Sequence, residues 1–195
     1  MSRYPDCSAL ILAGGESRRM GRDKATLPLD DQPLWQHVHH ILHPLFADIF
    51  LSVRRPRPDL PSPQLCDAPG QAGPLAGLRA GLAACPTPWL FVTACDMPFL
   101  QPELIATLAA QRTGQQVVIP SIEGHWQPLA AFYARSCLPY LDTLLTTRPH
   151  AGIRHALTDL PLCVVDAAHL RPADPELCSF FDLDTPQDWQ SAQRR

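Results

Sequence analysis

The stretch Leu10-Ile11-Leu12-Ala13-Gly14-Gly15-Glu16-Ser17-Arg18-Arg19-Met20-Gly21-Arg22-Asp23-Lys24 leads from a short apolar run into a loop with three glycines, two adjacent arginines and a lysine. Glycines let the backbone approach a ligand closely and present peptide N–H groups to phosphates. Arg19 and Lys24 bring positive charge to a triphosphate, and the arginine fork can make two contacts at once. We therefore expect a buried strand that feeds directly into a phosphate-binding loop.

The spacing within this loop differs from two common nucleotide-binding motifs. No Gly-Lys-Ser/Thr follows the glycines, as a P-loop requires, and the pattern is not Gly-x-Gly-x-x-Gly. A plain glycine-rich turn with solvated arginines is the alternative interpretation. The strand, the glycines and the basic side chains occur together within residues 10–24, and this combination favours ligand binding.

Length and composition place this loop in a single globular domain over residues 1–195. A chain of 195 residues buries roughly 70% of its unfolded surface, enough for one core without disulfides or a structural metal. The apolar share of 46% and the charged share of 18% are those of a soluble globular protein. The net charge of −3 argues against nucleic acid or an anionic membrane as the main partner.

The sequence also predicts a cytoplasmic protein. No apolar run approaches the ~20 residues of a membrane span, and the first apolar run lacks the pattern of a signal peptide. The seven cysteines contain no Cys-x-x-Cys pair, which excludes a zinc ribbon and a thioredoxin-like motif. We expect most of them to be buried thiols in a reducing compartment.

Alternating strands and helices predict an α/β fold: a three-layer, Rossmann-like, doubly wound, mostly parallel sheet that binds ligands at the carboxyl ends of its strands. Helices are expected to begin at prolines 33, 74, 102 and 186. The first of these should end or kink near Pro44. Apolar runs without alternation predict buried strands at residues 8–12, 49–53, 89–93, 117–120, 129–133 and 162–165, with a further short strand at 180–183.

One of these strands ends in an acidic residue. The segment Trp89-Leu90-Phe91-Val92-Thr93-Ala94-Cys95-Asp96-Met97-Pro98 brings Asp96 to the carboxyl end of a buried strand, where the glycine loop also opens. A carboxylate in this place is suited to hold Mg²⁺ against phosphates. A turn or helix-capping role before Pro98 is the alternative.

The glycine loop resembles a known signature. Leu12-Ala13-Gly14-Gly15-x-Ser17-x-Arg19-Met20-Gly21-x-Asp23-Lys24 is similar to that of the molybdenum cofactor guanylyltransferases (the MobA family), and Cys95-Asp96-x-Pro98 resembles their metal-binding segment. The resemblance implies a fold like that of the nucleotide-diphospho-sugar transferases. It also implies a Mg²⁺-dependent enzyme that transfers GMP from GTP to the phosphate of molybdopterin and releases pyrophosphate.

The resemblance also implies roles for individual residues. Arg19, Lys24 and Asp96 would be catalytic, and Asp96 would be the Mg²⁺ ligand. Gly14 stands where cytidylyltransferase relatives typically carry alanine, which would leave room for a purine. Asp67 would accept hydrogen bonds from the guanine edge, with a solvated turn as the alternative. The expected GTP-binding residues are Leu12, Ala13, Gly14, Gly15, Lys24, Ser52, Asp67 and Asp96.

The C-terminal segment adds two aspartates at positions where many relatives have asparagine. Either Asp182 or Asp184 would add a second carboxylate to the metal site. For Asp184 the sequence alone favours a different role, as the cap of the last helix before Pro186.

The partners implied are GTP and a molybdopterin-type cofactor, with transient contact with molybdoenzymes or their chaperones and no nucleic acid or membrane. Three alternatives remain at this stage. They are a molybdopterin cytidylyltransferase, a sugar-phosphate nucleotidyltransferase, and a non-catalytic protein that delivers the cofactor.

Overall fold

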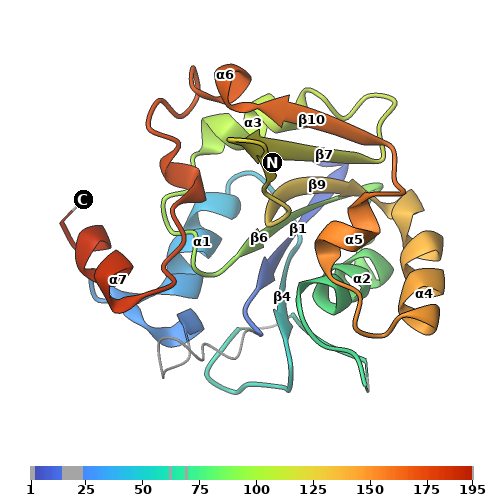
Figure 1. The fold of residues 1–195 in the computed structure, drawn as a ribbon. Coiled ribbons are helices and arrows are strands. Elements are labelled where there is room, and N and C mark those ends of the chain that lie inside the picture. Colours follow the sequence, from blue (N-terminus) through green and yellow to red (C-terminus); the bar gives the residue numbers. More distant parts are fainter. Residues whose placement is uncertain (1–2, 15–23, 62, 69, 195) are drawn as a thin grey trace.

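The computed structural model describes residues 3–14, 24–61, 63–68 and 70–194, except for the side chain of Pro186. Its centre is an eight-stranded sheet with helices on both faces (Figure 1). The strand order is β10-β7-β9-β6-β1-β4-β5, with β8 paired to β7. The strands are β1 (Cys7–Leu12), β4 (Ile49–Val53), β5 (Gln64–Cys66), β6 (Trp89–Ala94), β7 (Val117–Ile122), β8 (His125–Trp126), β9 (Ala130–Ala134) and β10 (Leu162–Asp166). A separate two-stranded sheet joins β2 (Pro28–Leu29) to β3 (Gln32–Pro33).

The large sheet is mostly parallel, as predicted. β1 runs parallel to β4 and β6, β4 to β5, and β7 to β10. β9 lies antiparallel between β6 and β7, and β8 is antiparallel to β7. The segment between the ends of β7 and β9 explains this reversal, because it is shorter than the dozen or so residues that a parallel crossover needs.

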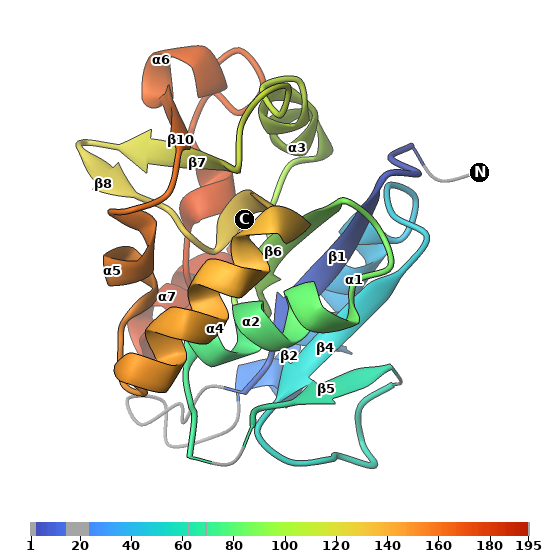
Figure 2. The ribbon, with the colours of Figure 1, turned by 90° about the vertical axis from the view of Figure 1, so that its right-hand side faces the viewer.

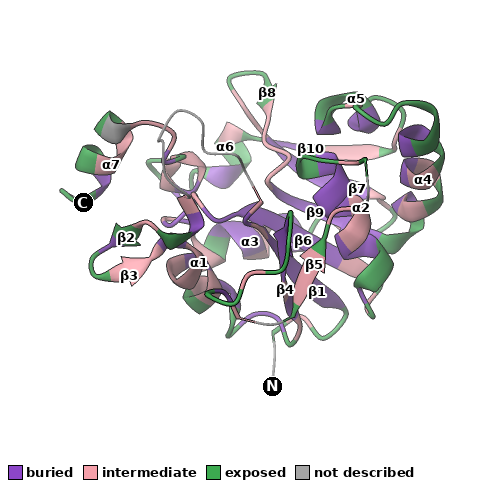
Figure 3. Ribbon diagram, turned by 90° about the horizontal axis from the view of Figure 1, so that it is seen from below, coloured by how far each residue is buried: buried purple, intermediate pink, exposed green. Residues whose placement is uncertain are grey.

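Helices cover both faces and complete three layers (Figure 2). α1 (Leu34–Leu42), α3 (Pro102–Ala109) and α6 (Ala167–Leu170) pack their apolar side chains into the core on one face. α2 (Pro74–Ala84), α4 (Leu138–Thr147) and α5 (Ile153–Leu157) build the core on the other. α7 (Pro186–Ala192) lies apart and packs against β2 and the start of α1 (Figure 3).

α2 comes unusually close to the sheet because glycines face it. A Cβ atom on Gly81 would lie 2.7 Å from Cδ2 of Leu10 and 2.9 Å from Cδ2 of Leu90, both side chains of the sheet. Real Cβ atoms do not approach this closely, so a larger residue would push the helix away. Gly81 thereby lets the C-terminal half of α2 pack closely on the middle of β1 and the start of β6.

The predicted helix starts are largely confirmed. Pro74, Pro102 and Pro186 occupy the first turns of α2, α3 and α7. Pro33 is the N-cap of α1, which ends at Leu42, before Pro44. No helix among the described residues is both long and apolar enough to cross a membrane.

The strand predicted at residues 180–183 is wrong. A 3-10 helix, η3 (Cys178–Phe180), stands at its start, followed by chain outside any sheet. The buried carboxylate of Asp174 explains this, because it accepts hydrogen bonds from the backbone N–H groups of Cys178 (2.9 Å) and Ser179 (2.8 Å). These interactions favour a tight turn over an extended strand.

Candidate functional site

The order of the strands places a switch point beside β1. From β1 the chain builds β4 and β5 on one side and then returns to form β6 on the other. Ligands of open α/β sheets bind outside the carboxyl ends of the strands at such a reversal of strand order. The three strand ends are joined here, since the N–H of Cys95 donates to the Leu12 carbonyl (3.1 Å) and that of Ala13 to the Ser52 carbonyl (2.9 Å).

Three distant parts of the chain bring charged side chains together at this edge. Lys24 lies at the start of η1 (Lys24–Thr26), and its ammonium group donates to Oδ2 of Asp96 at 2.7 Å. The same ammonium donates to Oδ1 of Asp184. The side chains of Lys24 and Asp96 are 14% and 17% exposed, whereas that of Asp184 is 41% exposed. Lys24 is thus a largely buried cation that bridges two carboxylates.

The electrostatic balance of this cluster is acidic. Burial by itself would lower the pKa of Lys24, but Asp96 and Asp184 outweigh burial and raise it above the usual value, so the amine is protonated at neutral pH. Asp182 is exposed as a residue. Loss of hydration around its carboxyl, and repulsion from Asp96 and Asp184, raise the pKa of that carboxyl to about 7. The repulsion arises because three aspartate carboxylates lie close together here. This part of the surface is therefore suited to binding cations.

Local hydrogen bonds fix the C-terminal segment against the site. The N–H of Leu183 donates to the carbonyl oxygen of Asp96 at 3.1 Å. Thr185 is the N-cap of α7: its hydroxyl oxygen accepts the N–H of Asp188 (3.2 Å), and Oδ2 of Asp188 accepts the N–H of Thr185 (2.7 Å). The expectation that Asp184 caps this helix is wrong, because Thr185 takes that role and the Asp184 carboxylate pairs with Lys24.

A second group of residues follows β4 and β5 on the same edge. A Cβ atom on Gly14 would lie 3.3 Å from the backbone N and 3.5 Å from Cγ of Arg54. The missing methyl group thus makes room for Arg54, a reason that the sequence did not suggest. Asp67 follows β5 and is half-buried. Burial raises the pKa of its carboxyl, whereas the nearby charge of Arg54 opposes this shift.

Ser52 contributes to the site mainly through its backbone. Its side chain is 4% exposed, and a Cβ atom on Gly77 of α2 would lie 2.6 Å from its Oγ and 2.7 Å from Cδ2 of Leu12. The hydroxyl therefore packs beneath the first turns of α2. A contact between Ser52 and a nucleotide stays a prediction.

The structure joins some of the predicted residues directly and leaves others apart. Lys24 and Asp96 are in contact, and Leu12, Ala13 and Ser52 lie at the linked ends of β1 and β4. Arg19 and Gly15 lie outside the described residues. Within the described chain, no three His, Cys, Asp or Glu side chains form a ready-made metal site.

Arg54 was not identified from the sequence, because it opens a proline-rich segment that indicates only a loop. Its position directly after a buried strand was the available signal.

The doubly wound sheet and the charged cluster at its switch point indicate an α/β protein with a ligand site at that edge, and the family match assigns it to the nucleotidyltransferases. Residues 9–164 match the MobA-like NTP transferase domain, and the chain belongs to that family.

Two relatives and one solved structure are similar over nearly the whole chain. The molybdenum cofactor guanylyltransferase of Pseudomonas aeruginosa (strain LESB58) is 36% identical over 196 residues, covering 95% of this chain and 94% of that protein. The probable molybdenum cofactor guanylyltransferase of Methanosarcina mazei is 30% identical, with coverages of 94% and 88%. The crystal structure of molybdopterin-guanine dinucleotide biosynthesis protein A from Archaeoglobus fulgidus is similar with a TM-score of 0.85 and 27% identity, covering 96% and 97% of the two chains.

Proposed function

We propose that this protein transfers GMP from GTP to the terminal phosphate of a molybdopterin cofactor, forming the guanine dinucleotide cofactor and pyrophosphate. The observation that carries the proposal is the contact between Lys24 and Asp96 at the switch point of the sheet. Simple binding of a nucleotide has less need of a cation and a carboxylate held together than phosphoryl chemistry does. The relatives named above supply the substrates of the proposal.

In the proposed reaction the phosphate of the acceptor attacks the α-phosphorus of GTP in line with the departing pyrophosphate. The proposed reaction needs no covalent enzyme intermediate, so positioning and charge neutralisation would carry the catalysis. Arg19 and the N–H groups of Gly14 and Gly15 would hold the β- and γ-phosphates. The ammonium of Lys24 would neutralise charge that develops on the α-phosphate and on the leaving group.

We also propose that the enzyme depends on Mg²⁺, held by Asp96 with Asp184 as a second carboxylate. The donor set fits the ion, because both side chains offer the hard oxygen ligands that Mg²⁺ prefers and already hold a cation between them. The remaining ligands would be phosphate oxygens and water, as is usual where Mg²⁺ binds with a nucleotide. When bound, the ion would stabilise negative charge on the phosphates.

The preference for guanine is assigned to Asp67. Its half-buried carboxylate follows β5, and the Arg54 guanidinium lies near enough to affect its charge. A carboxylate can accept hydrogen bonds from the N1–H and N2–H₂ groups of guanine, and neither adenine nor cytosine presents the same pair of donors.

We place the reaction in the cytoplasm, with transient contact with molybdoenzymes or their chaperones that receive the product. The described cysteines are free thiols, in keeping with a reducing compartment.

The test is calorimetric binding of GTP, CTP, ATP and UTP with Mg²⁺, followed by transfer from labelled GTP to molybdopterin. We expect GTP to bind most tightly, Asp67→Asn to weaken that preference, and EDTA to abolish transfer. Tighter binding of CTP would instead assign a cytidylyltransferase. Binding of GTP without transfer to molybdopterin would support the non-catalytic delivery protein.

A further inference from the structure

Lys24 is the only lysine of this chain, whose 16 basic residues are otherwise all arginines. This one ammonium group lies between the carboxylates of Asp96 and Asp184 and is 14% exposed. Lysine and arginine are not equivalent in such a place. An ammonium group is a compact point charge, whereas a guanidinium is a wide planar fork. Among the basic side chains, an ammonium is therefore the closer substitute for a metal ion.

The two carboxylates that Lys24 bridges are those proposed to hold Mg²⁺. Its Nζ lies 2.7 Å from Oδ2 of Asp96, so this oxygen is already engaged by a cation. A metal ion bound to the same carboxylates would lie within a few ångströms of the ammonium. Because the site is mostly buried, water would screen the repulsion between the two cations only weakly.

We propose that Lys24 occupies the cation site of the nucleotide-free protein, and that the divalent ion enters only together with the triphosphate. The inference rests on the proposed function. Lys24 already places a positive charge between Asp96 and Asp184, and a divalent ion bound to the same carboxylates would be repelled by that charge. The triphosphate supplies the negative charge that allows both cations to stay. Lys24 then turns from the carboxylates toward the phosphates.

The first test is a titration of the nucleotide-free protein with Mn²⁺, a paramagnetic substitute for Mg²⁺ whose free form is counted by electron paramagnetic resonance. Wild type should bind weakly. Lys24→Met removes the competing charge and should bind Mn²⁺ about tenfold more tightly or better. Lys24→Arg keeps the charge and should stay close to wild type.

A double variant locates the gained affinity. Lys24→Met combined with Asp96→Asn should lose the binding that Lys24→Met alone gains. The histidines of α1 are present in every variant, so any Mn²⁺ that they bind cancels in the comparison. Binding by Lys24→Met no tighter than by wild type would overturn the proposal, as would gained binding that survives in the double variant.

A second test uses wild-type protein and does not depend on how the variants fold. Lysine labelled with ¹³C at Cε gives one side-chain NMR signal, because the chain has one lysine. This signal should stay unchanged when Mg²⁺ is added alone and should move when Mg²⁺ and GTP are added together. A shift with Mg²⁺ alone, at the concentration used with GTP, would overturn the proposal.

These tests separate the inference from the proposed function. The Mn²⁺ titrations involve neither nucleotide nor acceptor, so a failure of guanylyl transfer would leave their outcome unaffected. Conversely, a protein that transfers GMP while Lys24→Met binds Mn²⁺ no better than wild type would refute the role of Lys24 alone.

Discussion

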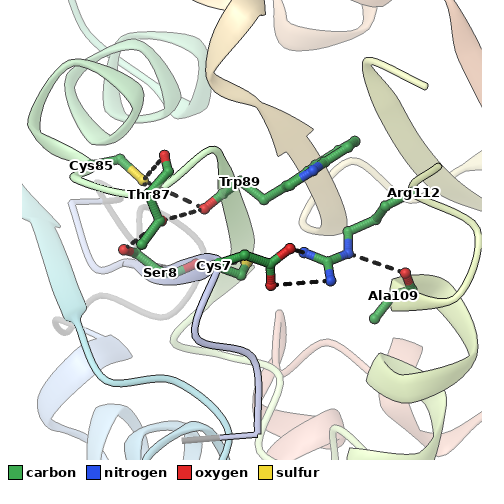
Figure 4. A network of polar contacts seen from close by, with 8 residues as sticks. Cys7, Ser8, Cys85, Thr87, Trp89, Ala109 and Arg112 are labelled. Carbon is green, nitrogen blue, oxygen red and sulfur yellow. Dashed lines mark hydrogen bonds and ion pairs between the residues drawn. The ribbon is translucent and has the colours of Figure 1, made fainter. Parts of the chain in front are cut away.

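In the described part of the chain, a mostly buried basic side chain lies at each edge of the large sheet, and the contacts of the two differ. At the carboxyl edge Lys24 is 14% exposed and contacts two carboxylates. At the amino edge Arg112 is also 14% exposed, and its contacts are of several kinds. Its Nε donates to the Ala109 carbonyl at 3.1 Å (Figure 4). Its Nη1 lies 3.1 Å from Oδ2 of Asp6.

Aromatic rings add to the hold on Arg112. Its guanidinium carbon lies 5.3 Å from the ring centre of Phe132, 5.6 Å from that of Trp89 and 5.7 Å from that of Tyr4. The planar group is thereby fixed to α3, β6, β9 and the N-terminal segment together. An open cleft of about 520 Å³ lies beside it, but Arg112, one of the residues that line this cleft, already has its contacts within the fold.

On the proposed function, this difference separates a structural cation, Arg112, from a functional one, Lys24. Arg112 contacts a carbonyl, a carboxylate and aromatic rings of the fold itself. It lies at the edge of the sheet opposite to the one where ligands of such folds bind. Lys24 contacts two carboxylates that, on the proposed function, would also bind a divalent cation. Equal exposure therefore carries no information about function, whereas the identity of the contacting groups does.

The largest expected effect is on turnover at the carboxyl edge. Asp96→Asn removes the charge proposed to hold Mg²⁺ and should lower kcat about 100- to 1,000-fold, with GTP still bound weakly. Asp6→Asn is the matched control, because it removes the carboxylate beside Arg112 and should leave kcat unchanged. Steady-state transfer assays measure kcat of both variants. Full activity of Asp96→Asn in Mg²⁺ would remove this residue from the mechanism.

The complementary effect is on stability at the amino edge. Arg112→Met removes a hydrogen bond, an ion pair and contacts with three rings, and should lower the free energy of unfolding by about 2–3 kcal/mol. Lys24→Met should lower it by only about 1–2 kcal/mol, because it leaves Asp96 (17% exposed) without its cation but Asp184 is partly hydrated. Urea denaturation of both variants measures the difference, and a larger loss for Lys24→Met would reverse the assignment of the two roles.

The two edges also differ in how much of their structure can be predicted from the sequence. The strand that leads into the glycine loop, the strand that ends before Asp96 and the prolines that begin helices follow local rules, and these parts of the prediction agree with the structure. The contacts of Arg112 join residues up to 106 positions apart, and no local sequence pattern predicts them. The error at residues 180–183 arose in the same way, since the buried Asp174 that shapes this turn lies outside the segment itself.

The site shows the same limit. Asp184 lies two residues before Pro186, so the local pattern indicated a helix cap. Its actual partner, Lys24, is 160 residues away, and only the folded chain brings the two together. Thr185 is also a favourable capping residue by sequence. Which of the two neighbours caps the helix depends on the distant Lys24, because it pairs with the Asp184 carboxylate.

A smaller effect is expected for the second carboxylate. Asp184→Asn should raise the Mg²⁺ concentration needed for half-maximal activity about three- to tenfold, because a partly solvated charge a few ångströms away affects affinity only moderately. Asp142→Asn is the control: Asp142 is similarly exposed (44%) and pairs with Arg79 on α2. Its Mg²⁺ requirement should match wild type. An unchanged requirement in Asp184→Asn would exclude Asp184 from the metal site.

The smallest effect concerns the cap that positions Asp184. Thr185→Ala removes the hydroxyl of the capping box and should lower the free energy of unfolding by about 1 kcal/mol. Thr143→Ala in α4, where the hydroxyl donates to a carbonyl within its own helix, should cost less than about 0.5 kcal/mol. If the cap also orients Asp184, Thr185→Ala will raise the Mg²⁺ requirement in the same direction as Asp184→Asn, though less. A loss of stability with an unchanged Mg²⁺ requirement would show that the contacts of Leu183 and Lys24 are enough to hold Asp184 in place.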